Sequence, residues 1–597
     1  MKNEKKNYIN GIDNFLLFTA LVAIVVFFKG LSSDILNFDD NEYFFNYPEI
    51  LKLNFSNVLL YFKKYYVLMY QPLPVLSFAI SNFLFGLNPF FHHFLNLAFH
   101  VFNIFLVYRF CRLLGANQTV VKITTFLFAV HPLVVEPVIW ISSRSSVMYV
   151  CFYLIALIHY IQYKNNFKKL SLIYCFLFFI LALFSKVHAV SFPLSIIVIE
   201  IFVFKTKIDF KFFIDKIPVF LLSLIFGVLA FLNTETTENI AFSSSVYTAY
   251  DYFFILNYEI IWYLVKILLP FELSPIYVYP IKTEGFLPYL YYVSAAVVAI
   301  SIFTVFKLKK HKSIILFGIL FFYSNLIFIF QIVPSRLFIV ADRYGYLANI
   351  GVFYIIGNLI SDFKTQNKTK AEYFSYIAAV VLIILSFLQT KIWKNDKTLA
   401  EKIISINPET PYIARAYGIR ANYYKDKEKR MDLALQDYLK AFSLDSNDWI
   451  SPYQAALIYS TNGELQQAND YFKKSCKIEN KSPLPYTDWG VLYSSLNDFK
   501  NAEICADSAL SRAKYFSNAL LLKSVCRLNF KDSVSALKIL TLCIDKNPKF
   551  SPAYKNRGII FFNNFKKTEE ACIDFNKAHQ LGEPGMQDIL NYYCQKK

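Results

Sequence analysis

The sequence predicts an all-α protein with two parts, a polytopic helical membrane domain followed by an α-solenoid of repeats. Hydrophobic residues make up 56% of the 597 residues, including 63 Phe and 43 Tyr, and only 17% are charged. A soluble core could not bury so much apolar surface. After Ile392 the composition becomes that of a soluble, helical sequence with an internal repeat. We therefore expect a membrane domain over 1–395 and a repeat domain over 410–597.

The length and spacing of the apolar runs predict about eleven transmembrane helices. Basic residues gather in the short connectors on alternate sides, as the positive-inside rule requires, and this pattern indicates membrane orientation rather than nucleic-acid binding. Lys2, Lys5 and Lys6 therefore place the N-terminus in the cytoplasm. The predicted spans are 15–31, 90–110, 120–140, 146–163, 170–185, 189–204, 217–232, 288–306, 313–331, 345–360 and 373–390.

Two further apolar regions are predicted to lie on the outer face without crossing. Residues 50–88 are interrupted by prolines and are typical of interfacial helices. If residues 252–269 crossed the membrane, the basic run KLKKHK at 307–312 would lie outside, so we expect an interfacial or re-entrant helix there. With these assignments the C-terminal domain lies on the exoplasmic side.

The C-terminal domain repeats with a period of 34 residues from register starts at 415, 449, 483, 517 and 551. Small or compact residues recur at the eighth position of each unit: Asn422, Ala456, Gly490, Ser524 and Gly558. This pattern resembles the tetratricopeptide repeat and predicts five repeats, with 584–594 as a short capping helix. Six of the nine cysteines fall here; buried free thiols are the favoured interpretation, and disulfides are the alternative.

An acidic stretch, LNFDDNEYFFN at 36–46, follows the first predicted span at the outer face. Asp39 and Asp40 lie where the chain leaves the membrane, and Glu42 follows. Placing acids beside a bilayer costs free energy, so their presence here suggests that they serve a function. A solvated acidic loop is the alternative interpretation.

Polar residues recur at the other predicted outer ends. His93, Asn96 and His100 share one helical face of the second span, and for His100 we favour an interhelical hydrogen bond. The remaining candidates are His131, Glu136 and Arg144 near the third span, Lys186 and His188 before the sixth, and Asp342, Arg343 and Tyr344 at the tenth.

Each of these groups could simply anchor a helix end. Together they suit an anionic lipid headgroup held beside a carboxylate base. Arg144, Lys186 and Arg343 are the predicted cations for a phosphate leaving group, since positive charge stabilises the developing anion. Glu42, His93, Asn96, His131, Glu136, His188, Asp342 and Tyr344 are predicted supporting residues. No CxxC or His-rich spacing predicts a metal site, and no cofactor is assigned.

The ordered motifs extend over nearly the whole chain: FDDNEYFFN, QPLPVLSF, HHFLNLAFH, FAVHPLVVEPVIWISSR, FSKVHAVSFP, LVKILLPFELSPIYVYP and VADRYGYLANIG. Followed by the repeats, they resemble the family of transmembrane and tetratricopeptide-repeat O-mannosyltransferases and their bacterial relatives. The resemblance implies a GT-C glycosyltransferase fold and a polyprenyl-phosphate sugar donor. It also implies that Asp39 or Asp40, with a slight preference for Asp40, is the base that activates an acceptor hydroxyl.

These observations predict a glycosyltransferase of the bacterial inner membrane with a periplasmic repeat domain. Its expected partners are the bilayer, a lipid-linked sugar donor and an exported protein captured by the repeats; no nucleic acid is expected. Two alternatives remain open. One is a ligase or polymerase of lipid-linked glycans, and the other is a non-catalytic, membrane-anchored assembly scaffold.

Overall fold

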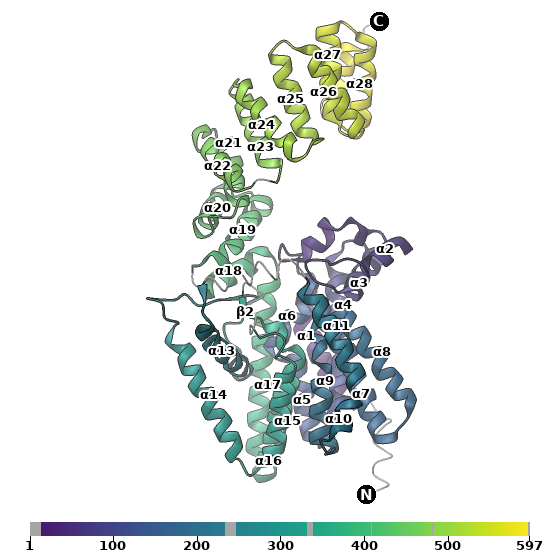
Figure 1. Cartoon of the computed structure of the whole chain (residues 1–597), viewed down its shortest axis with the longest axis vertical. Helices are drawn as coiled ribbons and strands as arrows, with labels where there is room; N and C mark the ends of the chain where they lie inside the picture. Colours follow the sequence, from purple (N-terminus) through teal and green to yellow (C-terminus); the bar gives the residue numbers. More distant parts are fainter. Residues whose placement is uncertain (1–12, 233–245, 331–337, 408, 480, 595–597) are drawn as a thin grey trace. The chain divides into compact units, whose positions relative to one another are not determined.

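The computed structural model describes residues 13–232, 246–330, 338–407, 409–479 and 481–594 and divides the chain into two compact units, Met1–Ile413 and Ala414–Lys597. Both units are helical (Figure 1). Within the described residues, β1 (Tyr277–Val278) and β2 (Phe338–Val340) form one antiparallel pair. The predicted all-α fold class is confirmed. Lys2, Lys5 and Lys6 lie outside the described residues.

Seven helical segments among the described residues are long and apolar enough to cross a membrane. Four shorter apolar helices also occur among these residues, and three of them lie in predicted spans: α8 (Lys169–Ser185), α11 (Ile217–Phe231) and α15 (Lys312–Ser324). The seven long segments are α1 with η1 (Asn14–Ser32), α4 (Pro89–Leu113), η5 with α7 (Ile141–Asn166), η6 with α9 and η7 (Val187–Phe204), α14 (Tyr289–Lys307), η8 with α16 (Asp342–Gln366) and α17 with η9 (Lys368–Trp393).

The predicted third span at 120–140 is a bent pair of helices rather than a straight one. Helix α5 (Gln118–Val130) ends at His131, and a second helical segment, Pro132–Ile139, follows at an angle of 54°. His131 has extended backbone angles because the residue before a proline is disfavoured in a helical conformation. The bend places α6 (Val135–Ile139) and its one polar residue, Glu136, inside the unit. With this pair and these three shorter helices, every predicted span overlaps helical structure, although the helix in the predicted span 313–331 ends at Ser324.

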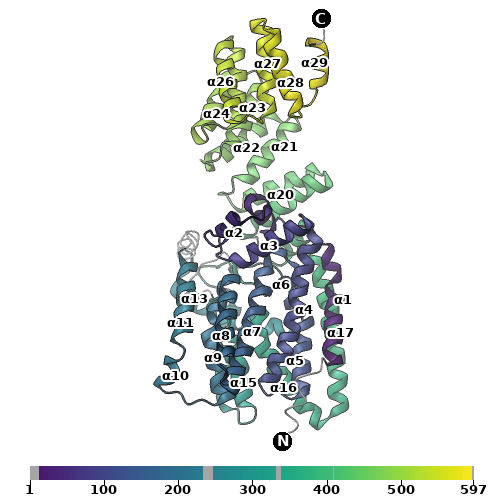
Figure 2. The same cartoon turned by 90° about the vertical axis from the view of Figure 1, so that its right-hand side faces the viewer.

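The helices of the first unit run alongside one another and leave different elements at the two ends of the bundle (Figure 2). Helices α2 (Phe55–Tyr61) and α3 (Pro72–Phe85) lie at one end, and α10 (Phe210–Ile214) lies at the other. Helix α13 (Ala249–Leu268), in the region predicted not to cross, is not among the segments apolar enough for a span. It lies beside α14 at the edge of the bundle (Figure 1).

Helices α15 and α16 approach closely because glycines face each other at their crossing. A Cβ atom added to Gly318 would lie 2.5 Å from the carbonyl oxygen of Gly351. Small residues at such crossings let helix backbones pack together in a membrane, where the hydrophobic effect gives little drive for association. Gly227, in α11, has no atom within 4 Å of the corresponding position.

The second unit consists of paired helices at the five predicted repeat positions. A Cβ atom on Gly490 or Gly558 would lie 2.5 Å from Leu522 or 2.6 Å from Phe575, which explains the small residues at the eighth repeat position. The pairs are α19 (Ala414–Tyr423) with α20 (Met431–Leu444), α21 (Ile450–Thr461) with α22 (Leu465–Ile478), α23 (Leu484–Ser495) with α24 (Phe499–Arg512), α25 (Ser517–Asn529) with α26 (Ser533–Lys546), and α27 (Ser551–Phe565) with α28 (Thr568–Gln580).

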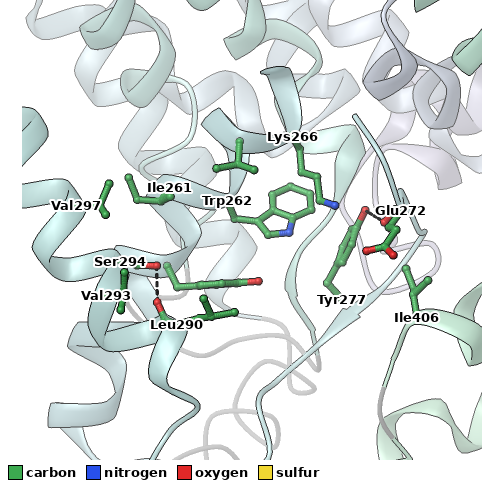
Figure 3. Close-up of a pocket in the computed structure, with 12 residues that line it drawn as sticks. Ile261, Trp262, Lys266, Glu272, Tyr277, Leu290, Val293, Ser294, Val297 and Ile406 are labelled. Atoms are coloured by element: carbon green, nitrogen blue, oxygen red, sulfur yellow. Dashed lines mark hydrogen bonds between the residues drawn. The ribbon is translucent and has the colours of Figure 1, made fainter. Parts of the chain in front are cut away.

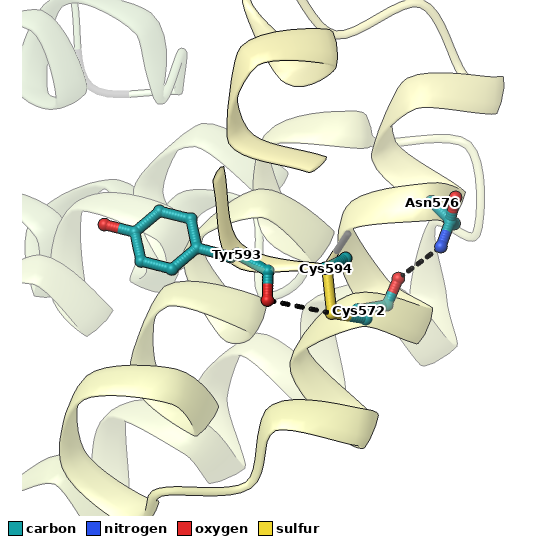
Figure 4. The surroundings of a disulfide bond; sticks show 4 residues. All are labelled: Cys572, Asn576, Tyr593 and Cys594. Carbon is teal, nitrogen blue, oxygen red and sulfur yellow. Dashed lines mark hydrogen bonds between the residues drawn. A yellow bond between two sulfur atoms is a disulfide. The ribbon is translucent and has the colours of Figure 1, made fainter. Parts of the chain in front are cut away.

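A final helix, α29 (Met586–Tyr593), packs on the last repeat and is joined to it by a disulfide between Cys572 and Cys594 (Figure 4). The two Cα atoms are 5.8 Å apart. The other seven cysteines are buried free thiols. The expectation of free thiols was therefore wrong for this pair, because a helix-turn-helix return brings together two residues that lie 22 positions apart in the sequence.

We predict that Gly351→Val disrupts the contact between α15 and α16. The added side chain meets backbone that cannot move aside, and overpacking of this kind costs about 1–3 kcal/mol. The apparent melting temperature of the detergent-solubilised protein should fall by several degrees, while the matched variant Gly227→Val should melt like the wild type. Equal melting temperatures for the two variants would contradict this account of the crossing.

Candidate functional site

Asp40 is fully buried in the loop between α1 and α2 and is satisfied by three donors. Its carboxylate accepts hydrogen bonds from the backbone N–H of Ser142 at 2.8 Å and of Leu36 at 3.2 Å, and also from the Ser142 hydroxyl. Removal from water raises the pKa of Asp40 to about 7, although these hydrogen bonds favour the ionised form. Asp40 thus fastens the acidic loop to the segment that precedes α7.

Asp39 is half-buried in the same loop and has a left-handed backbone conformation, with φ of 77°. Aspartate tolerates this conformation better than most residues. The indole N–H of Trp140 donates to the carbonyl of Phe38 at 2.9 Å, which holds the preceding residue. The loop therefore encloses Asp40 and leaves Asp39 as the more accessible acid of the pair. Glu42, also half-buried, begins the following short helix, η2 (Glu42–Asn46).

Arg343 lies in the turn between β2 and α16 and pairs with Glu136 from α6. The backbone N–H of Arg343 donates to Glu136 at 2.9 Å, and its guanidinium forms a salt bridge with the same carboxylate. The guanidinium also lies over three rings, with centroid distances of 5.1 Å to Trp140, 5.3 Å to Phe338 and 5.0 Å to Tyr344. Its charge interacts with that of Asp39. A contact network therefore connects α6, the start of α16 and the acidic loop.

Lys186 and His188 come from the turn between α8 and α9. The Lys186 ammonium donates to the Ser146 hydroxyl at 2.7 Å and lies 5.8 Å from the centre of the Tyr344 ring. The His188 ring lies 5.2 Å from the same tyrosine ring. Tyr344 therefore has Lys186, His188 and Arg343 around it. The structure brings these predicted residues together although they are distant in the sequence.

Asp342 is buried beside this cluster and accepts a hydrogen bond from the Tyr277 hydroxyl at 3.0 Å. The Tyr277 hydroxyl in turn accepts the backbone N–H of Ser274 at 2.8 Å. Strand β1, which begins at Tyr277, pairs with β2 immediately before Asp342. This short sheet positions the acid next to the Arg343 turn.

Arg144 is enclosed by the protein and binds several internal acceptors. Its Nε donates to Asn96 at 2.9 Å and one terminal nitrogen donates to the carbonyl of His92 at 2.6 Å. The guanidinium lies 4.6 Å from the centre of the Phe78 ring. Its charge interacts with that of Asp40. These contacts fit an internal tie that supports the acidic loop; binding of a donor phosphate by Arg144 stays a prediction.

The predicted histidines and Asn96 hold neighbouring segments in place. His93 lies 2.7 Å from the carbonyl oxygen of Ile139, and Asn96 donates to the carbonyl of Trp140 at 2.9 Å. His131 contacts the carbonyl oxygen of Ile267 at 2.9 Å, at the end of α13. His100 makes the expected interhelical bonds, 2.7 Å from the Tyr346 hydroxyl and 3.1 Å from the Ala129 carbonyl.

Trp140, Ser142 and Tyr277 are contact residues that the sequence analysis did not single out. Trp140 and Ser142 lie in the quoted motif VIWISSR, and Tyr277 lies in FELSPIYVYP. Their positions in these motifs were the available signal, but the contact partners come from distant segments. Within the described part of the chain, no group of three or more His, Cys, Asp or Glu side chains is placed to hold a metal ion.

The fold and this cluster define a class of protein: a helical membrane protein with charged residues gathered at one end of its bundle and a tetratricopeptide solenoid. A model of the tetratricopeptide repeat matches residues 453–482. Among solved structures, YrrB, "a TPR protein with an unusual peptide-binding site", is 22% identical with a TM-score of 0.27, covering 32% of this chain and 97% of that one. PilW, a type IV pilus biogenesis factor, is 20% identical with a TM-score of 0.28, covering 30% and 81%.

Curated relatives are named as protein O-mannosyl-transferases. The chain is 37% identical over 92 residues to TMTC1 of Mus musculus, and 34% identical over 96 residues to TMTC3 of Homo sapiens. The matched segments are 15% and 16% of this chain and 10% of each relative. The chain therefore spans about a tenth of the length of the curated relatives it matches, within the repeat region. The predicted resemblance to this family is confirmed over the repeat region.

We predict that Arg144→Met lowers the stability of the membrane unit. The variant leaves the buried acceptors of Asn96 and His92 without their donor, at a cost of about 1–3 kcal/mol for each. The apparent melting temperature should fall, while Arg109→Met, which removes an exposed arginine from the neighbouring helix α4, should leave it unchanged. If Arg144→Met melts like the wild type but binds a polyprenyl phosphate more weakly, the structural role of Arg144 is contradicted and direct phosphate binding is favoured.

Proposed function

We propose that the protein is a membrane glycosyltransferase that moves a sugar from a polyprenyl-phosphate donor to a hydroxyl of an exported protein. The observation that carries this proposal is the gathering of Asp39, Arg343 and Lys186 at one end of the helical bundle. Acids and cations are expensive beside a bilayer, and such groups commonly serve a function. The relatives named as O-mannosyl-transferases support the same reaction class.

The chemistry follows from the charges of the cluster. A carboxylate at Asp39 takes the proton of the acceptor hydroxyl as its oxygen attacks the anomeric carbon of the sugar. A new carbon–oxygen bond forms on one face while the bond to the phosphate breaks on the other, so the configuration inverts. The lipid phosphate leaves with the electron pair, and Lys186 and Arg343 stabilise its charge.

We assign the base to Asp39 rather than Asp40 because a base must reach its substrate. Asp40 is fully buried with three donors on its carboxylate, whereas Asp39 is half-buried. Asp40 then acts as a positioning residue that fixes the loop. The sequence analysis had slightly favoured Asp40. That preference was uncertain by nature, because the surroundings that distinguish two adjacent aspartates are visible only in the structure.

The site is proposed to face the exoplasm, in a bacterial inner membrane with the repeats in the periplasm. Lysine-rich connectors, such as Lys205–Lys216 beside α10, belong to the end of the bundle opposite α2 and α3 (Figure 2), and basic connectors favour the cytoplasm. The Cys572–Cys594 disulfide in the repeat unit fits an oxidising compartment.

The repeat unit is proposed to capture the acceptor protein. Tetratricopeptide solenoids present extended surfaces built from successive repeats. The first helices of the second and third repeats carry exposed apolar side chains, Ile450, Leu484 and Val491. Such residues suit contact with a peptide, and holding the acceptor near the membrane raises its effective concentration at the site.

We predict that Asp39→Asn lowers sugar transfer by about 10²–10⁴-fold, the usual contribution of a general base. Asp40→Asn is the matched variant; it should keep measurable transfer while lowering the melting temperature, because it alters the contacts that fix the loop. Transfer is measured in proteoliposomes with a lipid-linked hexose and a secreted acceptor, by intact mass spectrometry of the acceptor.

Two outcomes would contradict this assignment. Loss of transfer in Asp40→Asn alone, with kcat/KM of the wild type rising through a pH of about 7, would make Asp40 the base, since a base works only when deprotonated and its pKa is about 7. Full transfer by the variant that carries both Asp39→Asn and Asp40→Asn would show that this loop is not the catalytic site. Transfer to a lipid-linked glycan but to no protein would favour the ligase or polymerase alternative.

A further inference from the structure

A cavity of about 440 Å³ lies between α13 and α14, outside the cluster of charged residues (Figure 3). Its volume is in the range of small-molecule sites. Most of its lining is apolar or aromatic, with Ile261, Trp262, Leu290, Val293 and Val297 among the residues. Polar groups gather at one side, where Lys266, Glu272 and Tyr277 lie together (Figure 3).

The apolar side of this cavity opens through the surface of the helices. Leu290 and Val293 are 50% and 49% exposed although they line the cavity. Only 11% of the apolar part of α14 is buried inside the protein. In a membrane such a surface contacts hydrocarbon rather than water. A ligand can therefore enter from the lipid phase without crossing water.

The polar side connects the cavity to the candidate site. Tyr277 lines the cavity and donates its hydroxyl hydrogen to Asp342, which directly precedes Arg343. The charge of Lys266 interacts with that of Asp342. One end of the cavity is thus a hydrocarbon-lined groove, and the other end carries Lys266, Glu272 and Tyr277, one contact away from the acid–cation cluster.

We propose that this cavity holds the first part of the hydrocarbon chain of a polyprenyl phosphate, with the chain running past Lys266 so that the phosphate reaches the Arg343 turn. The apolar lining matches the chain, and the arginine matches the charge of the phosphate. This inference rests on the proposed function for the choice of lipid. It adds the segment α13–α14 as the binding site and Val293 and Val297 as residues that determine chain binding.

The test uses full-length protein in phosphatidylcholine vesicles and a sugar-free polyprenyl phosphate that carries a diazirine in its chain. After irradiation, mass spectrometry should find the label on peptides within 258–266 or 289–297. Val297→Trp fills the groove and should reduce labelling about tenfold, equivalent to about 1.4 kcal/mol of binding. Ile302→Trp, which adds the same ring to α14 at an exposed position outside the lining, should label like the wild type.

Label elsewhere in the chain, or equal labelling of Val297→Trp and Ile302→Trp in correctly folded protein, would overturn the proposal. Competition by phosphatidylglycerol as effective as by unlabelled polyprenyl phosphate would also overturn it, because the groove would then bind ordinary acyl lipids. Since the probe carries no sugar, specific labelling without any transfer activity would count against the proposed function and leave this lipid site standing.

Discussion

The buried carboxylate of Asp40 is the interaction on which the candidate site depends. It joins the loop after the first span to Ser142, about a hundred residues later, by accepting from the backbone N–H and the hydroxyl of Ser142, and it also accepts from the N–H of Leu36 within the loop. Hydrogen bonds to charged groups contribute about 1.5–3 kcal/mol each, and losing one leaves a buried group unsatisfied. Arg144 supplies the nearby positive charge and is itself tied to Asn96 and His92. The position of Asp39 follows from this arrangement.

The same constraint explains how the site keeps charges beside a membrane. Arg343 is paired with Glu136 and covered by aromatic rings, and Lys186 donates to a serine. Each of these two cations therefore has a partner at hydrogen-bonding distance, which limits the desolvation cost. Under the proposed function, the donor phosphate would exchange with these contacts, so that the cations stay paired.

Much of the fold could be predicted because hydropathy and repeat period are local properties of the sequence. Every predicted span overlaps a helix or a bent pair among the described residues, and the 34-residue register predicts where the helices of the solenoid pair. Counting the predicted membrane crossings was enough to predict that the charged groups of four distant motifs share the same end of the helical bundle. The bend at His131 and the Cys572–Cys594 bond depend on three-dimensional approach, and neither was predicted. The different environments of Asp39 and Asp40, and the enclosure of Arg144, also required the structure.

The proposed function requires that the site formed by Asp39, Lys186 and Arg343 transfers a sugar to a protein. In the most direct test, the purified, reconstituted protein is incubated with a polyprenyl-phosphate hexose whose sugar is isotopically labelled and with secreted proteins of the organism that makes it. Mass spectrometry then measures which molecules carry the label. The account predicts label on Ser or Thr residues of an acceptor, with the anomeric configuration inverted relative to the donor. Label that remains on the lipid with every hexose tested, while the protein stays folded and binds the lipid, would contradict the account.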